Sequence, residues 1–419
     1  MLPQEENQIM TWIKCLAVCM ILILPARCYT GIYLHFFDAP SNISVYYLNL
    51  VDLAIVLVTV FFTLGQHKII IESRAVPVYV VINIVMLLIA VVAGYMDYIG
   101  ELLSKSLIVL CAGVLASQIR RFTDAQKSSI YLVSLTILVV ASFFLSGYKG
   151  YATMNRVGSL GFGTNETANF ACCILAVALF VSNINIWLRA GASVLAVACI
   201  LNVASRRGMI VAIGVFIIWA LASLWKKKNS KIASRTFFAT LAIIVAGIVF
   251  IILRHEQIMN YINSSALMVR YRFTVKYNNE FMDYSGRVSI YKEVADYIKD
   301  HILFGSYGCD KIFAQGHIAH AHNLLLQFIA TYGLLIGPIY AGYAVVTFLR
   351  AIKMMHWYIE RKESAFPAIV SLFFILYFTF EMFGYLLWNP KGLFWIVLTM
   401  ILIRFEYRDC FARRAASEG

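Results

Sequence analysis

Stretches of apolar residues long enough to cross a lipid bilayer recur along almost the whole chain. About 20 such residues span the hydrocarbon core as an α-helix. Because 61% of the 419 residues are hydrophobic and only 14% are charged, a soluble globular protein is excluded. We therefore predict an all-α polytopic membrane protein with about twelve transmembrane helices. The predicted spans lie near residues 10–28, 45–65, 76–96, 103–118, 130–147, 167–183, 186–204, 208–225, 236–253, 323–348, 367–388 and 391–405.

The charges of the short loops predict the orientation of these spans. Lys and Arg accumulate on the cytoplasmic side of a membrane. With the N-terminus inside, every inward loop is basic, whereas residues 97–101 and 38–44 on the outer side carry no Lys or Arg. The net charge of +13 then reflects topology, and a nucleic-acid partner is not expected. The inward basic residues include Lys68, Arg74, Arg120, Arg121, Lys127, Arg189, Lys226, Lys227, Lys228, Arg350, Lys353, Arg361, Arg404, Arg408, Arg413 and Arg414.

A few arginines break this pattern on the predicted outer side. Arg206 and Arg207 lie in a short turn between two apolar runs, and Arg156 follows the fifth span. Arginine avoids such positions unless an anion or the lipid headgroups meet it. We interpret them as candidate phosphate contacts, with snorkelling to the headgroups as the alternative for either residue of the pair.

The predicted outward segment, residues 254–322, separates two membrane regions, residues 1–253 with nine spans and residues 323–419 with three spans and a cytoplasmic tail. Within it, helical spacing of apolar residues over 285–301 predicts an amphipathic helix lying on the membrane domain. Arg287 would lie in its first turn, where free backbone N–H groups attract anions. A guanidinium there could bind a phosphate with two hydrogen bonds. The expected apolar face consists of Val288, Tyr291, Val294, Ala295 and Ile298.

Three histidines end the outward segment: His317, His320 and His322. They lack the cysteine pair, carboxylate or HExxH spacing of common zinc sites, so neither a metal nor another cofactor is expected. We interpret His322 and Asn323 as the opening of the tenth span, with the imidazole kept neutral as a proton acceptor. His317 and His320 would border the cleft.

These residues resemble the bacterial O-antigen ligases and O-antigen polymerases, the Wzy/WaaL-like proteins. Members carry a His followed by Asn, Ser or Gln, then nine residues, then Gly-x-x-Gly. His322-Asn323, nine residues and Gly333 match, whereas Ile336 replaces the second glycine and Gly337 follows it. We expect both glycines to form a close helix-packing face.

The resemblance extends in order from Arg156 to Glu381. The family's outward Ser-Arg-Gly turn is similar to Ser205–Gly208, and its loop-helix arginine resembles Arg287. Its acidic residue at the outer end of the penultimate span resembles Glu381, and the Arg- and Gly-rich stretch before a span resembles residues 156–165. The implied fold is GT-C-like, with a periplasmic helical loop over the membrane helices.

The resemblance implies a metal-independent glycosyltransferase at the periplasmic face of the bacterial inner membrane. It would move a glycan from undecaprenyl diphosphate to a sugar hydroxyl. Arginines that bind the departing diphosphate more tightly as its charge grows would lower the barrier. The predicted catalytic residues are His322 for the hydroxyl proton, Arg206 and Arg287 for the diphosphate, and Glu381 to orient the histidine or balance an arginine. Further substrate contacts are expected from Arg207, Arg156, Asn323 and His320.

Two reactions fit this class. We favour an O-antigen polymerase, which joins one carrier-linked repeat unit to another, over a ligase that transfers the finished chain to the lipid A core; capsule polymers use the same chemistry. Besides the undecaprenyl-linked oligosaccharide and membrane lipid, a chain-length regulator protein is a candidate partner. A lipid-linked oligosaccharide flippase or transporter is the alternative from another class, although the chain shows no internal repeat.

Overall fold

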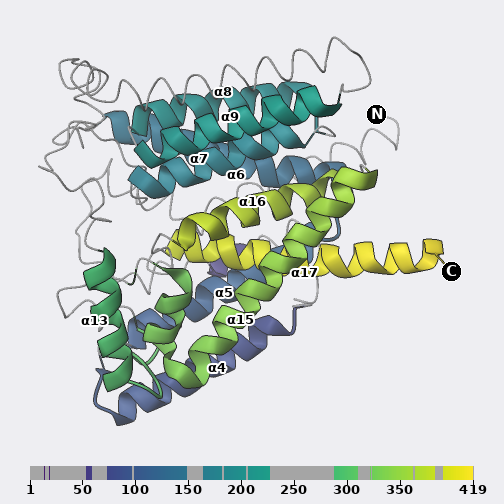
Figure 1. Cartoon of the computed structure of the whole chain (residues 1–419). Helices are drawn as coiled ribbons and strands as arrows, with labels where there is room; N and C mark the ends of the chain where they lie inside the picture. Colours follow the sequence, from purple (N-terminus) through teal and green to yellow (C-terminus); the bar gives the residue numbers. More distant parts are fainter. Residues whose placement is uncertain are drawn as a thin grey trace, which may run out of the picture.

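The computed structural model is helical throughout its described parts. It describes residues 14, 18, 53–58, 73–96, 99–148, 164–181, 184–203, 206–226, 287–309, 321, 323–361, 364–382 and 390–418, with no strand among them. The longer helices are α4 (Ala75–Val92), α5 (Ile99–Ile119), α6 (Asp124–Tyr148), α7 (Thr164–Phe180), α8 (Ile186–Val203), α9 (Arg206–Lys226), α15 (Leu324–Arg361), α16 (Ala365–Glu381) and α17 (Pro390–Glu418). A shorter helix, α13 (Arg287–Asp300), lies at one end of the bundle (Figure 1).

Nine of the predicted spans each overlap one of these longer helices. Among the described residues, three helices are long and apolar enough to cross a membrane, judged by length and composition: Ala75–Val92, Ile99–Ile119 and Leu324–Glu360. The apolar parts of α7, α8, α9 and α16 are shorter. A helical membrane protein is thus supported, while the count of twelve spans stays a prediction. The spans expected at 10–28, 45–65 and 236–253 lie almost wholly outside the described residues.

The helices form two groups joined by α16 and α17 (Figure 1). Helices α6, α7, α8 and α9 pack against one another, and α16 packs on α6 and α7. On its other side α16 contacts α15 and α17, while α17 also contacts α5, which carries α4. Large apolar side chains on the outer faces of α4, α8, α9 and α15 stay exposed, as expected for surfaces that face lipid.

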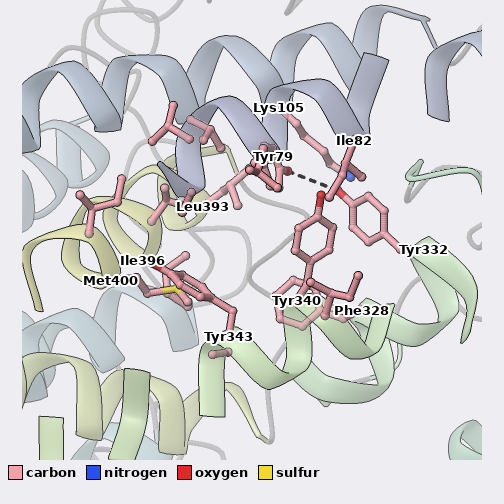
Figure 2. A pocket seen from close by; sticks show the side chains of 18 of the residues that line it. Tyr79, Ile82, Lys105, Phe328, Tyr332, Tyr340, Tyr343, Leu393, Ile396 and Met400 are labelled. Atoms are coloured by element: carbon pink, nitrogen blue, oxygen red, sulfur yellow. Dashed lines mark hydrogen bonds between the residues drawn. The ribbon is translucent and has the colours of Figure 1, made fainter. Parts of the chain in front are cut away.

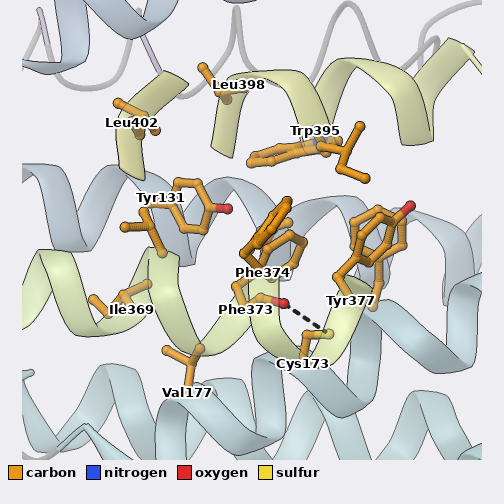
Figure 3. Close-up of a cluster of buried hydrophobic side chains, with 14 of the residues drawn as sticks. Tyr131, Cys173, Val177, Ile369, Phe373, Phe374, Tyr377, Trp395, Leu398 and Leu402 are labelled. Atoms are coloured by element: carbon orange, nitrogen blue, oxygen red, sulfur yellow. Dashed lines mark hydrogen bonds between the residues drawn. The ribbon is translucent and has the colours of Figure 1, made fainter. Parts of the chain in front are cut away.

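Aromatic rings fill the junction between the two groups (Figure 3). Tyr131 of α6 meets Phe373 of α16 and Trp395 of α17 edge-on, with ring centroids 5.8 and 5.5 Å apart. The Tyr131 hydroxyl shares a 2.6 Å hydrogen bond with Thr399, so its polar end is satisfied inside the core. Phe170 of α7 extends the cluster toward Phe373, at 5.9 Å. Directional ring and hydrogen-bond contacts therefore align α6, α7, α16 and α17.

The end of the bundle predicted to face the cytoplasm is held by charged side chains. Lys127 of α6 pairs with Glu406 of α17 at 2.6 Å, and both side chains are largely buried. The Asp124 carboxylate accepts hydrogen bonds from the Ser364 hydroxyl and from the N–H groups of Ala365 and Phe366, which caps α16. The starts of α6 and α16 therefore meet beside the last part of α17, in agreement with the predicted alternation of the spans.

Candidate functional site

Asn323 determines where α15 begins. Its side-chain oxygen accepts hydrogen bonds from the N–H groups of Leu325 and Leu326, at 3.0 and 3.1 Å, as an N-cap residue does. Its side-chain nitrogen donates to the carbonyl oxygen of Met382 at 3.3 Å. One amide thus caps α15 and ties that end to the residue after α16. The Asn that follows His322 in the motif is therefore explained by its role as the cap of α15.

The residue on the other side of the histidine is also held. The N–H of Ala321 donates to the side-chain oxygen of Gln327 at 2.8 Å, and the Gln327 side-chain nitrogen donates to the Thr331 hydroxyl at 3.1 Å. Ala321 is fully buried. His322 itself, like His317 and His320, lies outside the described residues. Ala321 and Asn323, the residues on either side of His322 in the sequence, are both held by hydrogen bonds that involve side chains.

Gln327 was not predicted from the sequence to belong to the site. Its side chain is buried, with 3% exposed, within a helix whose neighbouring residues are apolar. A buried amide is costly unless its hydrogen bonds are made, so such a residue in a spanning helix has a specific partner. Its spacing of four from Thr331 was the available signal, because residues four apart share one helix face.

Glu381 is the last residue of α16 and is buried, with 1% exposed. It directly precedes Met382, whose carbonyl accepts the hydrogen bond from Asn323, and its helix α16 packs against α7. The acidic residue selected from the sequence therefore lies at the junction of α7, α15 and α16. Its role in catalysis stays a prediction.

The predicted amphipathic helix is present as α13, and Arg287 is its first residue. Val294 is fully buried against Ala321 and Ala330, with Ile290, Tyr297, Ile298 and Leu326 packed around them. The expectation was wrong for Ala295, which is exposed because the buried stripe follows positions 290, 294, 297 and 298 instead. Helix α13 thus packs on the start of α15. The Arg287 side chain lies outside the described residues.

The arginine pair begins α9, with Arg206 and Arg207 as its first two residues. The expected turn therefore contributes its arginines to the first turn of a helix, where backbone N–H groups are free to bind an anion. Cys172 of α7 donates to the carbonyl oxygen of Gly208 at 3.3 Å, which ties this end of α9 to α7. Both arginine side chains, and Arg156, lie outside the described residues.

Helix α15 is broken at Gly333, where φ is 67° and ψ is −177°. Four backbone hydrogen bonds join the break to residues 302–308, which follow α13. Ser306 and Gly308 donate N–H groups to the carbonyls of Ala330 and Thr331, at 3.0 and 2.7 Å. Leu334 and Leu335 donate to the carbonyls of Ile302 and Leu303, at 2.8 and 3.3 Å. We name these four bonds the backbone clamp; they satisfy groups that a broken helix leaves open.

Glycine is required at the two motif positions, Gly333 and Gly337, for different structural reasons. A side chain on Gly333 would place its Cβ 2.1 Å from the Leu303 oxygen, and its φ lies in the left-handed region that favours glycine. A Cβ on Gly337 would lie 2.7 Å from the Cα of Ile329, in the other half of α15. The expected close packing is therefore present at Gly337, whereas Gly333 provides the break. Ile336, at the family's second glycine position, is buried instead beside Met86 and Tyr332.

Comparison with models of protein families gives a match to the part of the chain that contains α9, α13 and the start of α15. Residues 191–340 match the family model described as O-antigen ligase. This part of the chain is therefore similar to the O-antigen ligases. The match confirms the resemblance to O-antigen ligases and polymerases, a family whose members are glycosyltransferase-like enzymes. No curated protein matches the sequence.

The range that matches the O-antigen ligase model contains most of the predicted site. It includes Arg206, Arg207, Arg287, His322 and Asn323, together with the backbone clamp up to Leu335. Glu381 and Arg156 lie outside the matched range, so their assignment rests on position and resemblance. Across the described residues, three or more His, Cys, Asp or Glu side chains do not gather as a metal site. The histidine cluster lies outside those residues.

An ion pair on α5 holds residues 308 and 309, at the end of the segment that forms the backbone clamp. This ion pair was not predicted from the sequence. Lys105 pairs with Glu101 one turn earlier, at 3.1 Å, and donates to the carbonyl oxygen of Gly308 at 2.9 Å. Cys309 donates its thiol to the other oxygen of Glu101 at 2.7 Å. The signal was an acid and a base four residues apart at the start of an apolar helix. Their partner, 203 residues away in sequence, could not be read locally.

Proposed function

We propose that the protein is a glycosyltransferase that polymerises carrier-linked repeat units at the outer face of the bacterial inner membrane. The observation that carries the proposal is the packing of α13 on the start of α15, both within the range that matches the O-antigen ligase family, together with the hydrogen bond from Asn323 to the residue after α16. Predicted catalytic residues from distant parts of the chain belong to these three elements. The arginine pair begins α9, which α7 connects to α16.

The proposed reaction needs two kinds of group. The hydroxyl oxygen of the acceptor sugar attacks the anomeric carbon of the donor, and its proton passes to the His322 imidazole. The bond between that carbon and the diphosphate oxygen breaks, and the diphosphate leaves with the electron pair. Arg206 and Arg287 stabilise that charge, which is greatest as the bond breaks. Arg207 and Arg156 bind the same diphosphate.

Glu381 would act on the histidine or on an arginine. A buried carboxylate beside Asn323 could orient the imidazole by accepting its second N–H, or balance the guanidinium of Arg287. Asn323 and His320 would complete the acceptor side of the site. No metal or other cofactor enters this scheme.

The second candidate is O-antigen ligation, which the description of the matched family favours. Both reactions share the donor, the bond that breaks and the residues above. They differ in the acceptor, which is another carrier-linked unit in one case and the lipid A core in the other. A protein that sets chain length is a proposed partner for the polymerase alone.

The experiment is the lipopolysaccharide banding pattern of a deletion strain complemented at matched protein levels. Complementation uses the wild-type gene, His322→Ala or Arg287→Ala, with His356→Ala and Lys299→Ala as controls. His356 lies on α15 and Lys299 on α13, where both side chains are exposed. The proposal predicts that the first two variants fail and both controls restore the ladder.

The failing strains separate the candidates. A core that carries a single repeat unit supports the polymerase. Bare core with carrier-linked polymer accumulating would replace it by the ligase. Identical ladders from the deletion strain and from every variant would refute both reactions for O-antigen, and would leave capsule synthesis or transport of a lipid-linked oligosaccharide as the function.

A further inference from the structure

An apolar pocket opens between α4, α5, α15 and α17 (Figure 2). The pocket and its open mouth hold about 1030 Å³ of empty space. Its lining includes Val78 of α4 and Ile339 of α15, which are 55% and 58% exposed on the outer faces of their helices. Because those faces are expected to meet lipid, the pocket opens sideways toward the bilayer. A hydrocarbon chain could enter it without crossing water.

The polar side chains at one end of the pocket already have partners within the protein. The hydroxyls of Tyr79 and Tyr332 share a 3.3 Å hydrogen bond (Figure 2). Lys105 also lines this end, where it is paired with Glu101 and bonded to Gly308. A ligand with a charged group would therefore gain little by placing it here. An apolar chain suits this end.

The opposite end of the pocket leads to three cations. Tyr343 of α15 and Met400 of α17 line the pocket; Arg350 follows Tyr343 by about two helical turns, and Arg404 follows Met400 by about one. Arg350 and Lys353 also lie over the Tyr407 ring, with their charged atoms 5.6 and 5.9 Å from its centroid. We name Arg350, Lys353 and Arg404 the basic cluster.

The basic cluster has no acidic counterpart in the described part of the chain. The carboxylates at this end pair elsewhere: Glu406 with Lys127, Asp409 with Arg120 and Arg408, and Glu360 with Arg414. The general excess of Lys and Arg on the cytoplasmic side explains why basic residues are present. It does not explain why three gather at the end of an apolar pocket.

We propose that the pocket and the basic cluster bind one anionic phospholipid from the leaflet at this end of the protein. The headgroup phosphate would contact Arg350, Lys353 and Arg404, and one acyl chain would lie in the pocket. Basic pockets between transmembrane helices on the cytoplasmic side bind anionic headgroups in this way. The Tyr407 ring holds two of the cations in place. This lipid site does not depend on the proposed transferase reaction.

The test is lipid binding to the purified, delipidated full-length protein, measured by native mass spectrometry. The probes are dioleoyl phosphatidylglycerol, which is anionic, and dioleoyl phosphatidylcholine, which has no net charge. We expect one phosphatidylglycerol per chain and at least tenfold weaker binding of phosphatidylcholine. Replacing the basic cluster by Gln at all three positions should weaken phosphatidylglycerol binding by about two orders of magnitude.

The matched control removes three cations from the same end without touching the basic cluster. The triple variant Arg121→Gln, Arg408→Gln, Arg413→Gln should retain binding within about threefold, since these exposed residues lie outside the pocket. If the triple cluster variant does not fold, the single change Lys353→Gln, at an exposed position, replaces it. It should weaken binding about fivefold.

A further pair of variants tests the acyl chain. Ala344→Phe fills the pocket, because Ala344 lines it and is 1% exposed. Gly342→Phe adds a similar side chain on the same helix where an added Cβ meets no atom within 4 Å. Only the first should reduce phosphatidylglycerol binding. Equal binding of the two lipids, full binding by the cluster variant, or displacement of phosphatidylglycerol by undecaprenyl phosphate would each overturn the proposal.

Discussion

The substitution Gly333→Ala tests whether the backbone clamp holds α13 and α15 together. At φ 67° and ψ −177° a side chain is strained by about 1–3 kcal/mol. The new Cβ would also lie 2.1 Å from the Leu303 oxygen and 2.3 Å from its carbonyl carbon. Overpacking of this kind adds about 1–3 kcal/mol.

The clamp limits how large the penalty can become. If strain exceeds the free energy that the four clamp bonds contribute, residues 302–308 detach instead. Each bond is worth about 1 kcal/mol net, so detachment costs about 4 kcal/mol. We therefore expect Gly333→Ala to destabilise the protein by about 2–4 kcal/mol, which lowers the melting temperature by about 2–5 °C for a chain of this length. Because Arg287 reaches α15 through α13 and the clamp, transfer activity should fall as well.

The assay compares Gly333→Ala with Gly342→Ala, a control on the same helix. An added Cβ on Gly342 meets nothing within 4 Å, so the control should be neutral or slightly stabilising. Thermal unfolding of both purified proteins, followed by tryptophan fluorescence, gives stability, and the lipopolysaccharide ladder of complemented strains gives activity. Equal melting temperatures and full ladders for the two variants would show that the backbone clamp does not hold α13 and α15 together.

Three smaller predictions concern single contacts. Asn323→Ala removes the α15 cap and should cost about 0.5–2 kcal/mol in a thermal unfolding measurement, whereas Asn323→Asp keeps an oxygen acceptor and should cost less; equal losses would contradict the capping role. Lys127→Met leaves the buried Glu406 carboxylate without its partner and should cost about 3–5 kcal/mol. Adding Glu406→Leu should recover most of that lost stability. If it does not, the loss comes from disturbed packing rather than from the unpaired carboxylate. Tyr131→Phe loses its bond to Thr399 and should cost about 1 kcal/mol, so a change near zero would contradict a contribution from that bond.

The positions of many helices followed from local patterns. Apolar runs of spanning length predicted α4 to α9 and α15 to α17, because the hydrocarbon core sets the length of a crossing helix. Helical spacing within a polar segment predicted α13, with Arg287 in its first turn. The amide after His322 could be assigned to the opening of α15 because Asn is a preferred cap.

Contacts between distant segments could not be predicted in the same way. The break at Gly333 depends on carbonyl and N–H groups of residues 302–308, and backbone atoms carry no sequence signal. The capping of α16 by Asp124 joins residues about 240 apart, although Asp124 alone looks like an ordinary first-turn acid. Helical periodicity indicates which face of a helix is buried, but not which helix covers it.

Binding of the lipid product tests the central claim most directly. If Arg206 and Arg287 bind the diphosphate of the carrier, labelled undecaprenyl diphosphate should bind the purified wild-type protein in nanodiscs. Arg206→Gln and Arg287→Gln should each weaken binding about tenfold or more, because each removes charge-assisted hydrogen bonds. Lys299→Gln, at an exposed position on the same helix as Arg287, should leave it unchanged. Equal affinities in all four proteins would contradict a diphosphate site at the starts of α9 and α13.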